Sequence, residues 1–208
     1  MAKVKYILQG GGEHARVVLD CLLAQGSEVT GLFDPKYSGG HLFGIPQLGR
    51  YDPAFEPDAL AIVAIGDNAL RRKVSGLTRQ KFGNAIHPST VLSAHSAWGH
   101  GCMILHGAIV QAQTQMGNHV ILNTGCRVDH DCVIGDFVHI GPGAILCGTI
   151  QVGEGTFIGA GAIITPGKKI GSWVTIGAGS VVIDDVPDYA LVVGNPGRII
   201  KYVKQQYK

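Results

Sequence analysis

The stretch ILNTGCRVDHDCVIGDFVHIGPGAIL, residues 121–146, shows the pattern that decides the fold. Within this stretch a large apolar residue returns at every sixth position, at Leu122, Val128, Ile134, Ile140 and Leu146. The same step extends in both directions without a break, so that seventeen consecutive positions from residue 86 to residue 182 are large and apolar. A period of six fits neither an amphipathic helix nor the simple alternation of a half-buried strand.

The other positions of the repeat indicate a short strand followed by a corner. The residue two places before each large one is mostly small, and strand alternation turns both of them inward. The residue directly after the large one is often glycine, as at Gly135 and Gly141. We interpret this glycine as the corner residue, because glycine tolerates positive φ. Three strands then close a triangular coil of eighteen residues, and coils stack at the strand spacing of about 4.8 Å.

The repeat therefore predicts a triangular parallel β-helix of about five coils over residues 84–186. An ordinary β-sandwich is the alternative, but sandwich strands do not keep a fixed six-residue step over so long a stretch. After the repeat, Asn195, Pro196 and Gly197 interrupt the pattern. We expect residues 187–208 to form a segment that caps the end of the prism, as terminal repeats must.

The composition excludes several classes of protein. Of the 208 residues 46% are hydrophobic, which argues against a disordered chain. The formal net charge is +2, and no basic stripe of the kind that binds nucleic acid occurs. No run of 18 apolar residues is present, and the N-terminal stretch is unlike a signal peptide. The five cysteines form no CxxC pair, so we expect reduced thiols and a cytoplasmic location.

The first part of the chain, residues 1–83, predicts a small α/β domain. Strand-like and helix-like segments alternate in it. We expect strands at 4–9, 28–34 and 59–67, and helices at 15–26 and 69–83. This order implies a parallel sheet.

The turn after the first strand resembles a phosphate-binding loop. Gly10, Gly12 and Ala15 match G-x-G-x-x-G/A, and Asp34 follows at the end of the second strand. A domain of about 80 residues is only half of a dinucleotide fold. We therefore predict a mononucleotide or a nucleotide sugar rather than NAD, held by glycine amides and a helix N-terminus. Asp34 would accept a hydrogen bond from the ribose or the base. NAD itself, and a tight turn without any ligand, are the alternatives.

The residues that point outward from the prism predict an assembly. Two of its three faces carry apolar stripes: Met103, Ile121, His139 and Phe157 on one, and Ile109, Ile145, Ile163 and Val181 on the next. Exposed apolar stripes mark interfaces, and two such faces flanking one edge suit a closed ring. We expect a homotrimer. The alternative is that the N-terminal region folds back over these faces.

Several motifs resemble one family over essentially the whole chain. GGGEHARVV at 10–18, FDP at 33–35, AIGD at 64–67 and the hexads are similar to bacterial hexapeptide-repeat sugar acetyltransferases. This group includes sialic-acid O-acetyltransferases, UDP-4-amino-sugar N-acetyltransferases and GDP-perosamine N-acetyltransferases. The resemblance implies a left-handed parallel β-helix, a homotrimer, acetyl-CoA as co-substrate and no metal.

The resemblance also implies roles for individual residues. His130 matches the general base, and Asp131 matches the acid that raises its basicity, although a member of the family carries the longer glutamate there. Residues matching the nucleotide-sugar site are Gly11, Gly12, His14, Asp34, Lys36, Gly66 and Asp67. Residues expected to line the CoA site, between neighbouring prisms, are His139, Gly148, Ala160, Ala178 and Lys168. Pro35 departs from the family, which often has a second acid after the aspartate.

The implied chemistry is direct attack of a sugar amine on the thioester, with His130 taking the proton. A backbone N–H near Gly148 is the expected donor to the oxyanion. O-acetylation of sialic acid or another sugar is the main alternative. A zinc enzyme like the gamma-class carbonic anhydrases, with ligands among His106, His130 and His139, and a non-catalytic nucleotide-sugar-binding protein are others. The sequence leaves open UDP against GDP and the position of the amino group.

Overall fold

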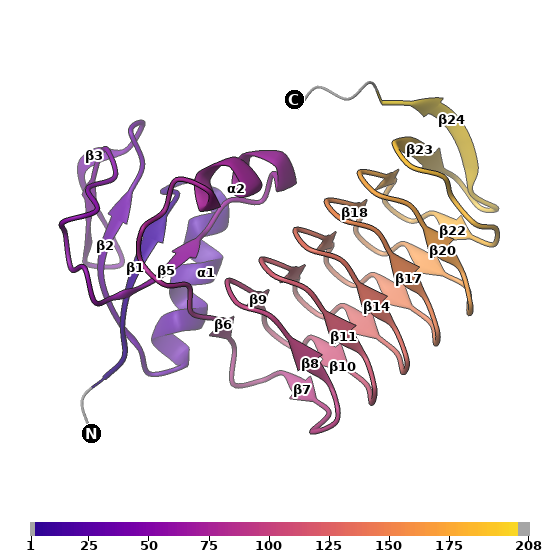
Figure 1. Ribbon diagram of the computed structural model, residues 1–208, viewed down its shortest axis with the longest axis horizontal. Helices are drawn as coiled ribbons and strands as arrows, with labels where there is room; N and C mark the ends of the chain where they lie inside the picture. The colour runs from indigo at the N-terminus through magenta and orange to yellow at the C-terminus, as the bar shows by residue number, and fades with distance from the viewer. Residues whose placement is uncertain (1–2, 204–208) are drawn as a thin grey trace.

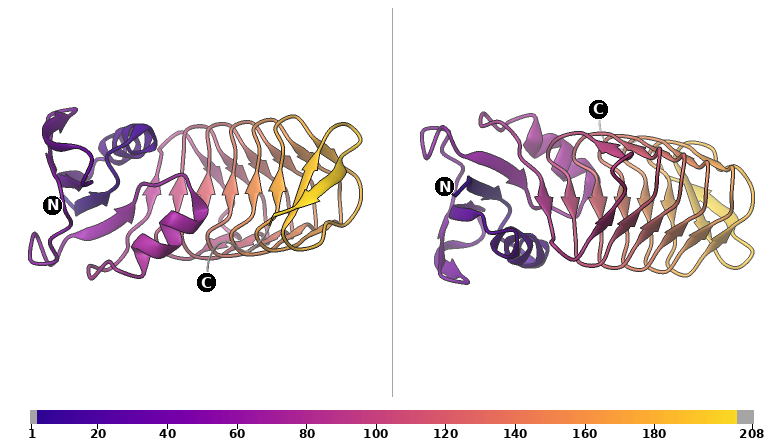
Figure 2. Two further views of the ribbon diagram at one scale, coloured as in Figure 1. Left: turned by 90° about the horizontal axis from the view of Figure 1, so that it is seen from above. Right: turned by 90° about the horizontal axis from the view of Figure 1, so that it is seen from below.

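A computed structural model describes residues 3–203 and shows two parts, a small α/β domain and a long triangular prism (Figure 1). The prism begins beside the α/β domain and extends away from it, with the chain climbing one coil after another. Figure 2 shows the α/β domain at one end of the prism, where one of its helices reaches over the first coils. Within residues 3–203, no helix has the length and hydropathy of a membrane-spanning segment.

The α/β domain is a five-stranded sheet with the order β3-β4-β2-β1-β5, in which β2, β1 and β5 run parallel. Its elements are β1 (Lys5–Gln9), α1 (Glu13–Ala24), β2 (Glu28–Phe33), β3 (Ser38–Leu42), β4 (Ile45–Leu48), β5 (Leu60–Val63) and α2 (Asn68–Ser75). The strand–helix–strand order predicted the parallel part. The β3–β4 hairpin was not predicted, because its short, glycine-containing sequence lacks alternation.

The second helix is shorter than the sequence predicted. We expected a helix over 69–83, but α2 ends at Ser75 and Gly76 is its C-cap. Beyond Gly76 the residues interact with other segments of the domain instead of continuing the helix. Gln80 is buried and donates a hydrogen bond to the carbonyl oxygen of Phe55 at 3.1 Å, and Phe82 forms a parallel bridge with Ala61.

The prism consists of two-residue strands that pair in parallel with the strand eighteen residues further on. The first sheet contains β6 (Ala85–Ile86), β9 (Met103–Ile104), β12 (Ile121–Leu122), β15 (His139–Ile140), β18 (Phe157–Ile158) and β21 (Thr175–Ile176), extended by β23 (Ala190–Val193) and β24 (Arg198–Tyr202). The second contains β7 (Val91–Leu92), β10 (Ile109–Val110), β13 (Arg127–Val128), β16 (Ile145–Leu146), β19 (Ile163–Ile164) and β22 (Val181–Val182). The third contains β8 (Ala97–Trp98), β11 (Gln115–Met116), β14 (Val133–Ile134), β17 (Gln151–Val152) and β20 (Lys169–Ile170).

The hexad pattern correctly predicted the interior of the prism. The large residues occupy the second position of each strand, and from Val110 to Val182 all are buried. The small residues two places earlier, such as Cys132 and Ala144, fill the space between them. Burial of each large aliphatic side chain contributes roughly 1.5–3 kcal/mol, so the column of such residues holds the coils together.

The interpretation of the glycine that follows each large residue was wrong. Positive φ occurs three places after the large residue, for example at Gly125 (66°) and Asp131 (57°). The glycine directly after the large residue meets the next coil instead. A Cβ at Gly141 would lie 2.7 Å from the carbonyl oxygen of Ile158, and one at Gly159 would lie 2.6 Å from the amide nitrogen of Ala178. Close stacking of coils, rather than backbone conformation, requires glycine there.

The α/β domain folds back over part of one apolar face of the prism. The sequence pattern left this covering open as the alternative to an interface between chains. Met103 and Ile121 are fully buried and share one core cluster with Val18 and Leu22 of α1. Further along the same face Phe157 is exposed. The predicted domain boundaries at residues 83/84 and 186/187 stay predictions, and residues 204–208 of the expected capping segment lie outside the described residues.

Candidate active site

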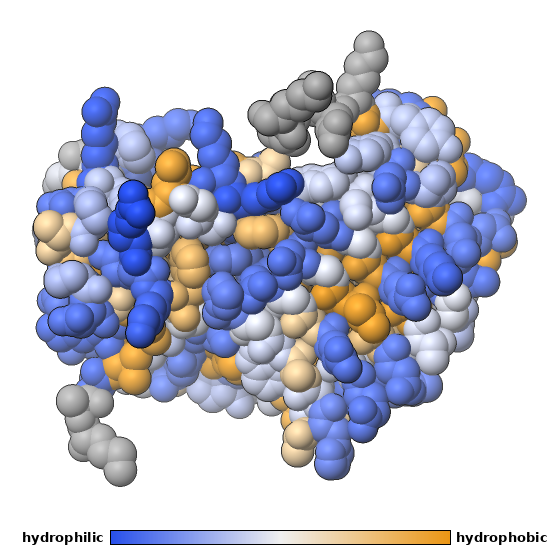
Figure 3. All heavy atoms as spheres, viewed as in Figure 1, coloured by the Kyte–Doolittle hydropathy of each residue, from blue (hydrophilic) through white to orange (hydrophobic). Residues whose placement is uncertain are grey.

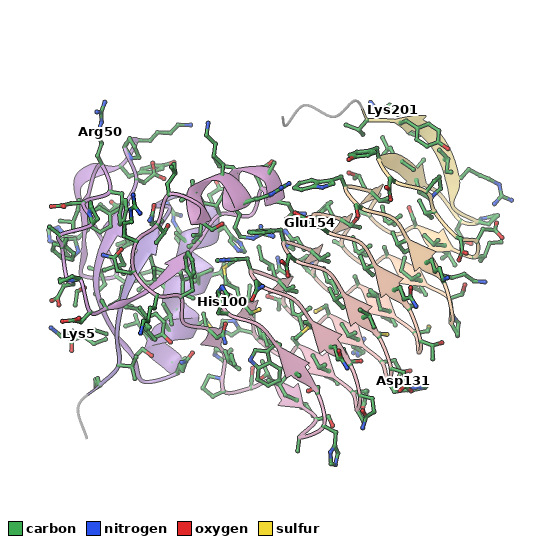
Figure 4. The ribbon with its side chains drawn as sticks, viewed as in Figure 1. Lys5, Arg50, His100, Asp131, Glu154 and Lys201 are labelled. Carbon is green, nitrogen blue, oxygen red and sulfur yellow. The ribbon has the colours of Figure 1, made fainter. Side chains whose placement is uncertain are left out.

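His130 and Asp131 form an exposed pair at the corner between β13 and β14. Asp131 has a φ of 57°, and its carboxylate oxygen Oδ2 lies 2.7 Å from Nδ1 of His130. The backbone N–H of His130 donates to Oδ1 of Asp129 at 2.8 Å. Figure 4 shows Asp131 on an edge of the prism that faces away from the α/β domain. This edge therefore presents an imidazole that a carboxylate orients.

The surroundings of His130 suit a proton acceptor. The hydrogen bond to Asp131, and then the negative charge of Asp129, raise the pKa of His130 above its ordinary value. Because a carboxylate can only accept, Nδ1 carries the proton and Nε2 keeps its lone pair. Gly148 lies against the ring: a Cβ at this position would be 2.7 Å from both Cε1 and Nε2 of His130. Any side chain at position 148 would therefore collide with the imidazole ring in this position.

A cavity of about 630 Å³ lies at the carboxyl ends of β1, β2 and β5, beside α2. This is where open parallel sheets bind ligands. Five of the predicted substrate residues line it: Gly12, His14, Asp34, Lys36 and Gly66. The remainder is mixed: apolar side chains such as Phe33, Leu70 and Val74 line it together with polar ones, among them Gln9, Glu13 and Arg50. Gly10 has a φ of 111°, and a Cβ there would lie 2.8 Å from the carbonyl oxygen of Ala64, so this turn requires glycine.

Asp34 and Asp67 hold backbone turns at this cavity. The two oxygens of Asp34 accept from the amides of Gly11 and Lys36, each at 2.9 Å, and so tie the first loop of the domain to the second. Asp67 is the N-cap of α2 and accepts from the amide of Leu70 at 2.7 Å. Gly11 and Asp67 are not among the residues that line the cavity, so their predicted contacts with substrate stay predictions.

His139 is buried at the junction of the two domains, with both ring nitrogens engaged. Nδ1 donates to the carbonyl oxygen of Gly66 at 3.2 Å, and Nε2 accepts from the side-chain amide of Asn123 at 3.1 Å. Burial, and then the positive charge of Arg71, lower the pKa of His139 to about 3. The same two causes lower the pKa of neighbouring His14 to about 4. Nε2 of His14 is buried and has no hydrogen-bond partner within residues 3–203.

One chain does not bring the predicted CoA residues together. Gly148 and Lys168 lie on the edge that carries His130, between the second and third sheets. Ala160 and Ala178 are exposed on the next edge, between the first and second sheets, and His139 lies beneath the α/β domain. A single CoA molecule would meet these groups only across a seam between chains, so their role stays a prediction.

The histidines considered as zinc ligands also lie apart within the chain. His106 pairs with Asp20 at 3.0 Å and stacks on His87 with 3.6 Å between ring centroids, whereas His130 pairs with Asp131. Residues 3–203 contain no group of three or more His, Cys, Asp or Glu side chains placed to hold a metal ion.

Sequence reasoning missed Arg71 and Asn123 at the domain junction. Arg71 is fully buried, whereas its neighbour Arg72 is exposed. Nothing in the sequence distinguishes these two arginines, because the surface that buries Arg71 belongs to a different part of the chain.

Comparisons with known proteins identify the family of the chain. Residues 5–76 match the model of the PglD N-terminal domain, and residues 131–166 and 149–184 match that of the bacterial transferase hexapeptide, six repeats. The structure is similar to that of a histidine-to-alanine variant of GDP-perosamine N-acetyltransferase from Caulobacter crescentus, in complex with CoA and GDP-perosamine. The two are 37% identical, with a TM-score of 0.90, over 96% of this chain and 98% of that one.

The chain belongs to the hexapeptide-repeat N-acetyltransferases of nucleotide-linked amino sugars. Its prism is the left-handed parallel β-helix of this family, as the sequence resemblance implied. The acetyltransferase domain of PglB from Neisseria gonorrhoeae FA1090, in complex with acetyl coenzyme A, is a further relative, 33% identical over 96% of this chain and all of that one, with a TM-score of 0.89.

A curated member of this hexapeptide-repeat family, UDP-N-acetylbacillosamine N-acetyltransferase from Bacillus subtilis (strain 168), is 36% identical over 105 residues. This match covers 46% of the present chain and spans about half of the relative, 49% of its length.

Proposed function

We propose that this protein transfers acetyl from acetyl-CoA to the amino group of a nucleotide-linked amino-deoxy sugar, with His130 as general base. The observation that carries the proposal is the combination of a cavity at the carboxyl ends of β1, β2 and β5 with an imidazole that Asp131 orients. Complexes of the Caulobacter crescentus relative contain CoA together with GDP-perosamine, and the Neisseria gonorrhoeae domain contains acetyl coenzyme A.

The geometry at His130 supports direct transfer. The sugar amine attacks the thioester carbonyl while Nε2 of His130 takes the proton that the nitrogen loses. The C–S bond then breaks as the tetrahedral oxyanion collapses, and CoA leaves as its thiolate, which takes up a proton. Asp131 keeps the imidazole in the tautomer that can accept and stabilises the imidazolium that forms. Cys132 is buried inside the prism, so its thiol is not accessible to form an acyl-cysteine.

We further propose a homotrimer in which the cavity of one chain faces His130 of its neighbour. Two features support this. The cavity lies in the α/β domain beside α2, which packs on the prism corners at 119 and 137, whereas His130 lies on a different edge. The second sheet also keeps an apolar stripe with partly exposed Ile109, Ile145 and Ile163. In the view of Figure 3, apolar side chains also form a band across the prism. The CoA groups on two edges, Gly148 with Lys168 and Ala160 with Ala178, would meet in such a seam. We also propose a cytoplasmic location, because the cysteines are free thiols, as is usual in a reducing compartment.

The substrate proposal is tested with a panel of acceptors. Thiol release from acetyl-CoA is measured with UDP- and GDP-linked 3-amino and 4-amino sugars, and with sialic acid. We expect release with a nucleotide-linked amino sugar and a product heavier by one acetyl group on nitrogen. Release only with sialic acid would indicate O-acetylation, and no release with any acceptor would overturn the proposal.

The shared site is tested by mixing two inactive variants. His130→Ala removes the base, and Gly12→Leu fills the cavity without strain, because a Cβ at Gly12 meets nothing within 4 Å. If each site combines two chains, co-expression restores about a quarter of wild-type activity, since a random mixture rebuilds intact sites. Mixtures that stay inactive, or a monomer in sedimentation, would contradict the shared site.

A further inference from the structure

Arg71 of α2 is a buried cation that contacts no carboxylate within the part of the chain that the structure describes. Its relative exposure is 0%. All of its hydrogen bonds go to carbonyl or amide oxygens. Nε donates to His119 O at 3.0 Å, Nη1 to Ile65 O at 3.0 Å and Gly66 O at 3.3 Å, and Nη2 to Asn68 Oδ1 at 2.8 Å and Phe137 O at 2.7 Å.

These acceptors come from both domains. Ile65 and Gly66 belong to the loop between β5 and α2, whereas His119 and Phe137 are stacked corners of the prism, both with positive φ. Asn68, one turn earlier in α2, donates from Nδ2 to the carbonyl oxygens of Gly155 at 3.0 Å and Thr156 at 3.3 Å. Since the corners at 119, 137 and 155 repeat every eighteen residues, one turn of α2 contacts three successive coils.

The surface contacts of α2 follow the same edge. Arg72 pairs with Glu154 at 3.4 Å and lies over the ring of Trp173 at 5.6 Å. Figure 4 shows Glu154 on the prism beside α2. The side chains of Arg72 and Glu154 are exposed, and an exposed ion pair contributes little. The buried donors of Arg71 and Asn68 therefore fix the docking of α2.

A buried arginine is not the simplest way to pack two domains together. Burial lowers the pKa of Arg71 to about 9, which reflects an unfavourable environment for its charge. Apolar residues of similar size often stabilise a junction equally well. The guanidinium instead provides five donors in a rigid plane, so its contribution is geometric: it sets the distance and angle between the loop and the corners.

The loop that Arg71 holds is a wall of the substrate cavity, because Ile65 and Gly66 both line it. The carbonyl oxygen of Gly66 also accepts from Nδ1 of His139, on β15 of the prism. This one peptide group is therefore held by the prism through His139 and by Arg71, which is itself bound to two prism corners.

Resting on the proposed function, we propose that Arg71 is a positioning residue, which holds the Ile65–Gly66 wall of the cavity at a fixed place on the prism and so aligns the bound sugar with the acetyl donor. In a symmetric assembly the orientation of the cavity on its own prism also sets its orientation toward the neighbouring His130. We expect the nucleotide end of the substrate at the loops that follow β1 and β2, around Gly12 and Asp34, to which Arg71 donates no hydrogen bond. Loss of Arg71 therefore changes turnover more than nucleotide affinity.

Two substitutions of Arg71 test this inference against a control on the same helix. Arg71→Gln removes the charge and the planar guanidinium, whereas Arg71→Lys keeps the charge with a different donor geometry. Lys73→Gln, the control, removes an exposed charge. Each variant is assayed for folding by circular dichroism, for oligomeric state, for kcat and KM, and for binding of UDP and GDP alone.

We expect kcat to fall about tenfold or more in both Arg71 variants, because small misplacements of reacting groups are costly. The dissociation constant of the nucleoside diphosphate should stay within about threefold, as it reports only on binding. Lys73→Gln should match the wild type. A folded Arg71→Gln with wild-type kcat would overturn the inference. A parallel loss of kcat and nucleotide affinity would also overturn it, since this would indicate a general structural role.

Hydrogen exchange separates this inference from the proposed function. In Arg71→Lys, the milder variant, amide exchange should rise in peptides covering residues 64–70 and 136–138 and stay unchanged in the coils above residue 160. Unchanged exchange at 64–70 would contradict the proposal that Arg71 holds the Ile65–Gly66 loop in place. If the wild-type protein acetylates no acceptor, the proposed function fails. The exchange result still decides whether Arg71 holds the Ile65–Gly66 loop in place.

Discussion

His130 and His139 are nine positions apart on the same prism, yet their surroundings differ in every physical respect. His130 lies on an exposed edge, pairs with Asp131, and has a raised pKa. His139 lies beneath the α/β domain, binds a carbonyl oxygen and an amide, and has a pKa lowered to about 3. The repeat gives both histidines a place on the surface of the prism. The neighbouring Asp131 then sets the surroundings of His130, whereas docking of the α/β domain buries His139.

This difference suits the two residues to different tasks. A base needs a free lone pair, and His130 provides one on Nε2, with a pKa that Asp131 raises above its ordinary value. His139 is neutral at physiological pH with both nitrogens occupied, so it can hold the Gly66 loop but has no lone pair left for a proton. On the proposed function, the prism would carry the reactive group on its open edge and the positioning groups on its covered side.

Removal of the His130 imidazole tests the first half of the comparison and has the largest expected effect. His130→Ala should lower kcat by about 10²–10⁴, the usual contribution of a general base. Binding of UDP or GDP, measured by calorimetry, should persist, because the cavity lies elsewhere in the chain. A variant with full activity would remove His130 from the mechanism.

Crowding the His130 ring should have the next largest effect. In Gly148→Ala the new Cβ would lie 2.7 Å from Nε2, so the ring must swing away from its place beside Asp131. We expect kcat to fall about tenfold to a hundredfold with little change in Tm. Gly76→Ala is the matched control, since its nearest contact is an ordinary 3.6 Å. Unchanged kcat in Gly148→Ala would show that the ring position is not critical.

Acid should lower the free energy of unfolding, because His14 and His139 are largely buried at the junction of the two domains. The unfolded chain protonates His14 and His139 near their ordinary value of 6.5, whereas the folded chain does so only near 4 and 3. Between these limits the unfolded state binds more protons, so the free energy of unfolding falls as pH is lowered from about 6.5. Each histidine contributes about tenfold in the folding equilibrium per pH unit.

Thermal unfolding between pH 7 and pH 5 measures this acid sensitivity. His14→Gln should show a shallower dependence of Tm on pH, because one group whose pKa differs between the states is removed. The Nε2 atom that it loses has no partner within residues 3–203, so the change costs no hydrogen bond there. An identical slope in the variant and the wild type would contradict the assignment.

Replacement of the carboxylate beside His130 should have the smallest effect. Activity rises with pH as His130 loses its proton, and the Asp131 hydrogen bond places this step above the ordinary value. Asp131→Asn should move the acidic limb of the kcat/KM profile to lower pH and reduce the maximal rate by about three- to tenfold. A limb that does not move, or moves upward, would show that Asp131 does not set the pKa.

Much of the fold could be predicted from the sequence because each hexad is a local signal. Inward residues such as Leu122 and Ile134 depend only on the period, and the His130–Asp131 pair consists of adjacent residues. The site within the α/β domain was predictable to the extent that glycines at a strand end mark a phosphate-binding turn. The role assigned to the glycine after each large residue was wrong, since a contact between coils is not visible along one strand.

The sequence by itself determined the triangular coil, the open edge with its imidazole and carboxylate, and the family, because these follow from spacing and from neighbours in the chain. Only the tertiary structure decided that the α/β domain covers Met103 and Ile121, that Arg71 rather than Arg72 is buried, and that His139 is neutral. The physical reason is that burial and pKa depend on what packs against a residue, and here the packing groups lie dozens of residues away.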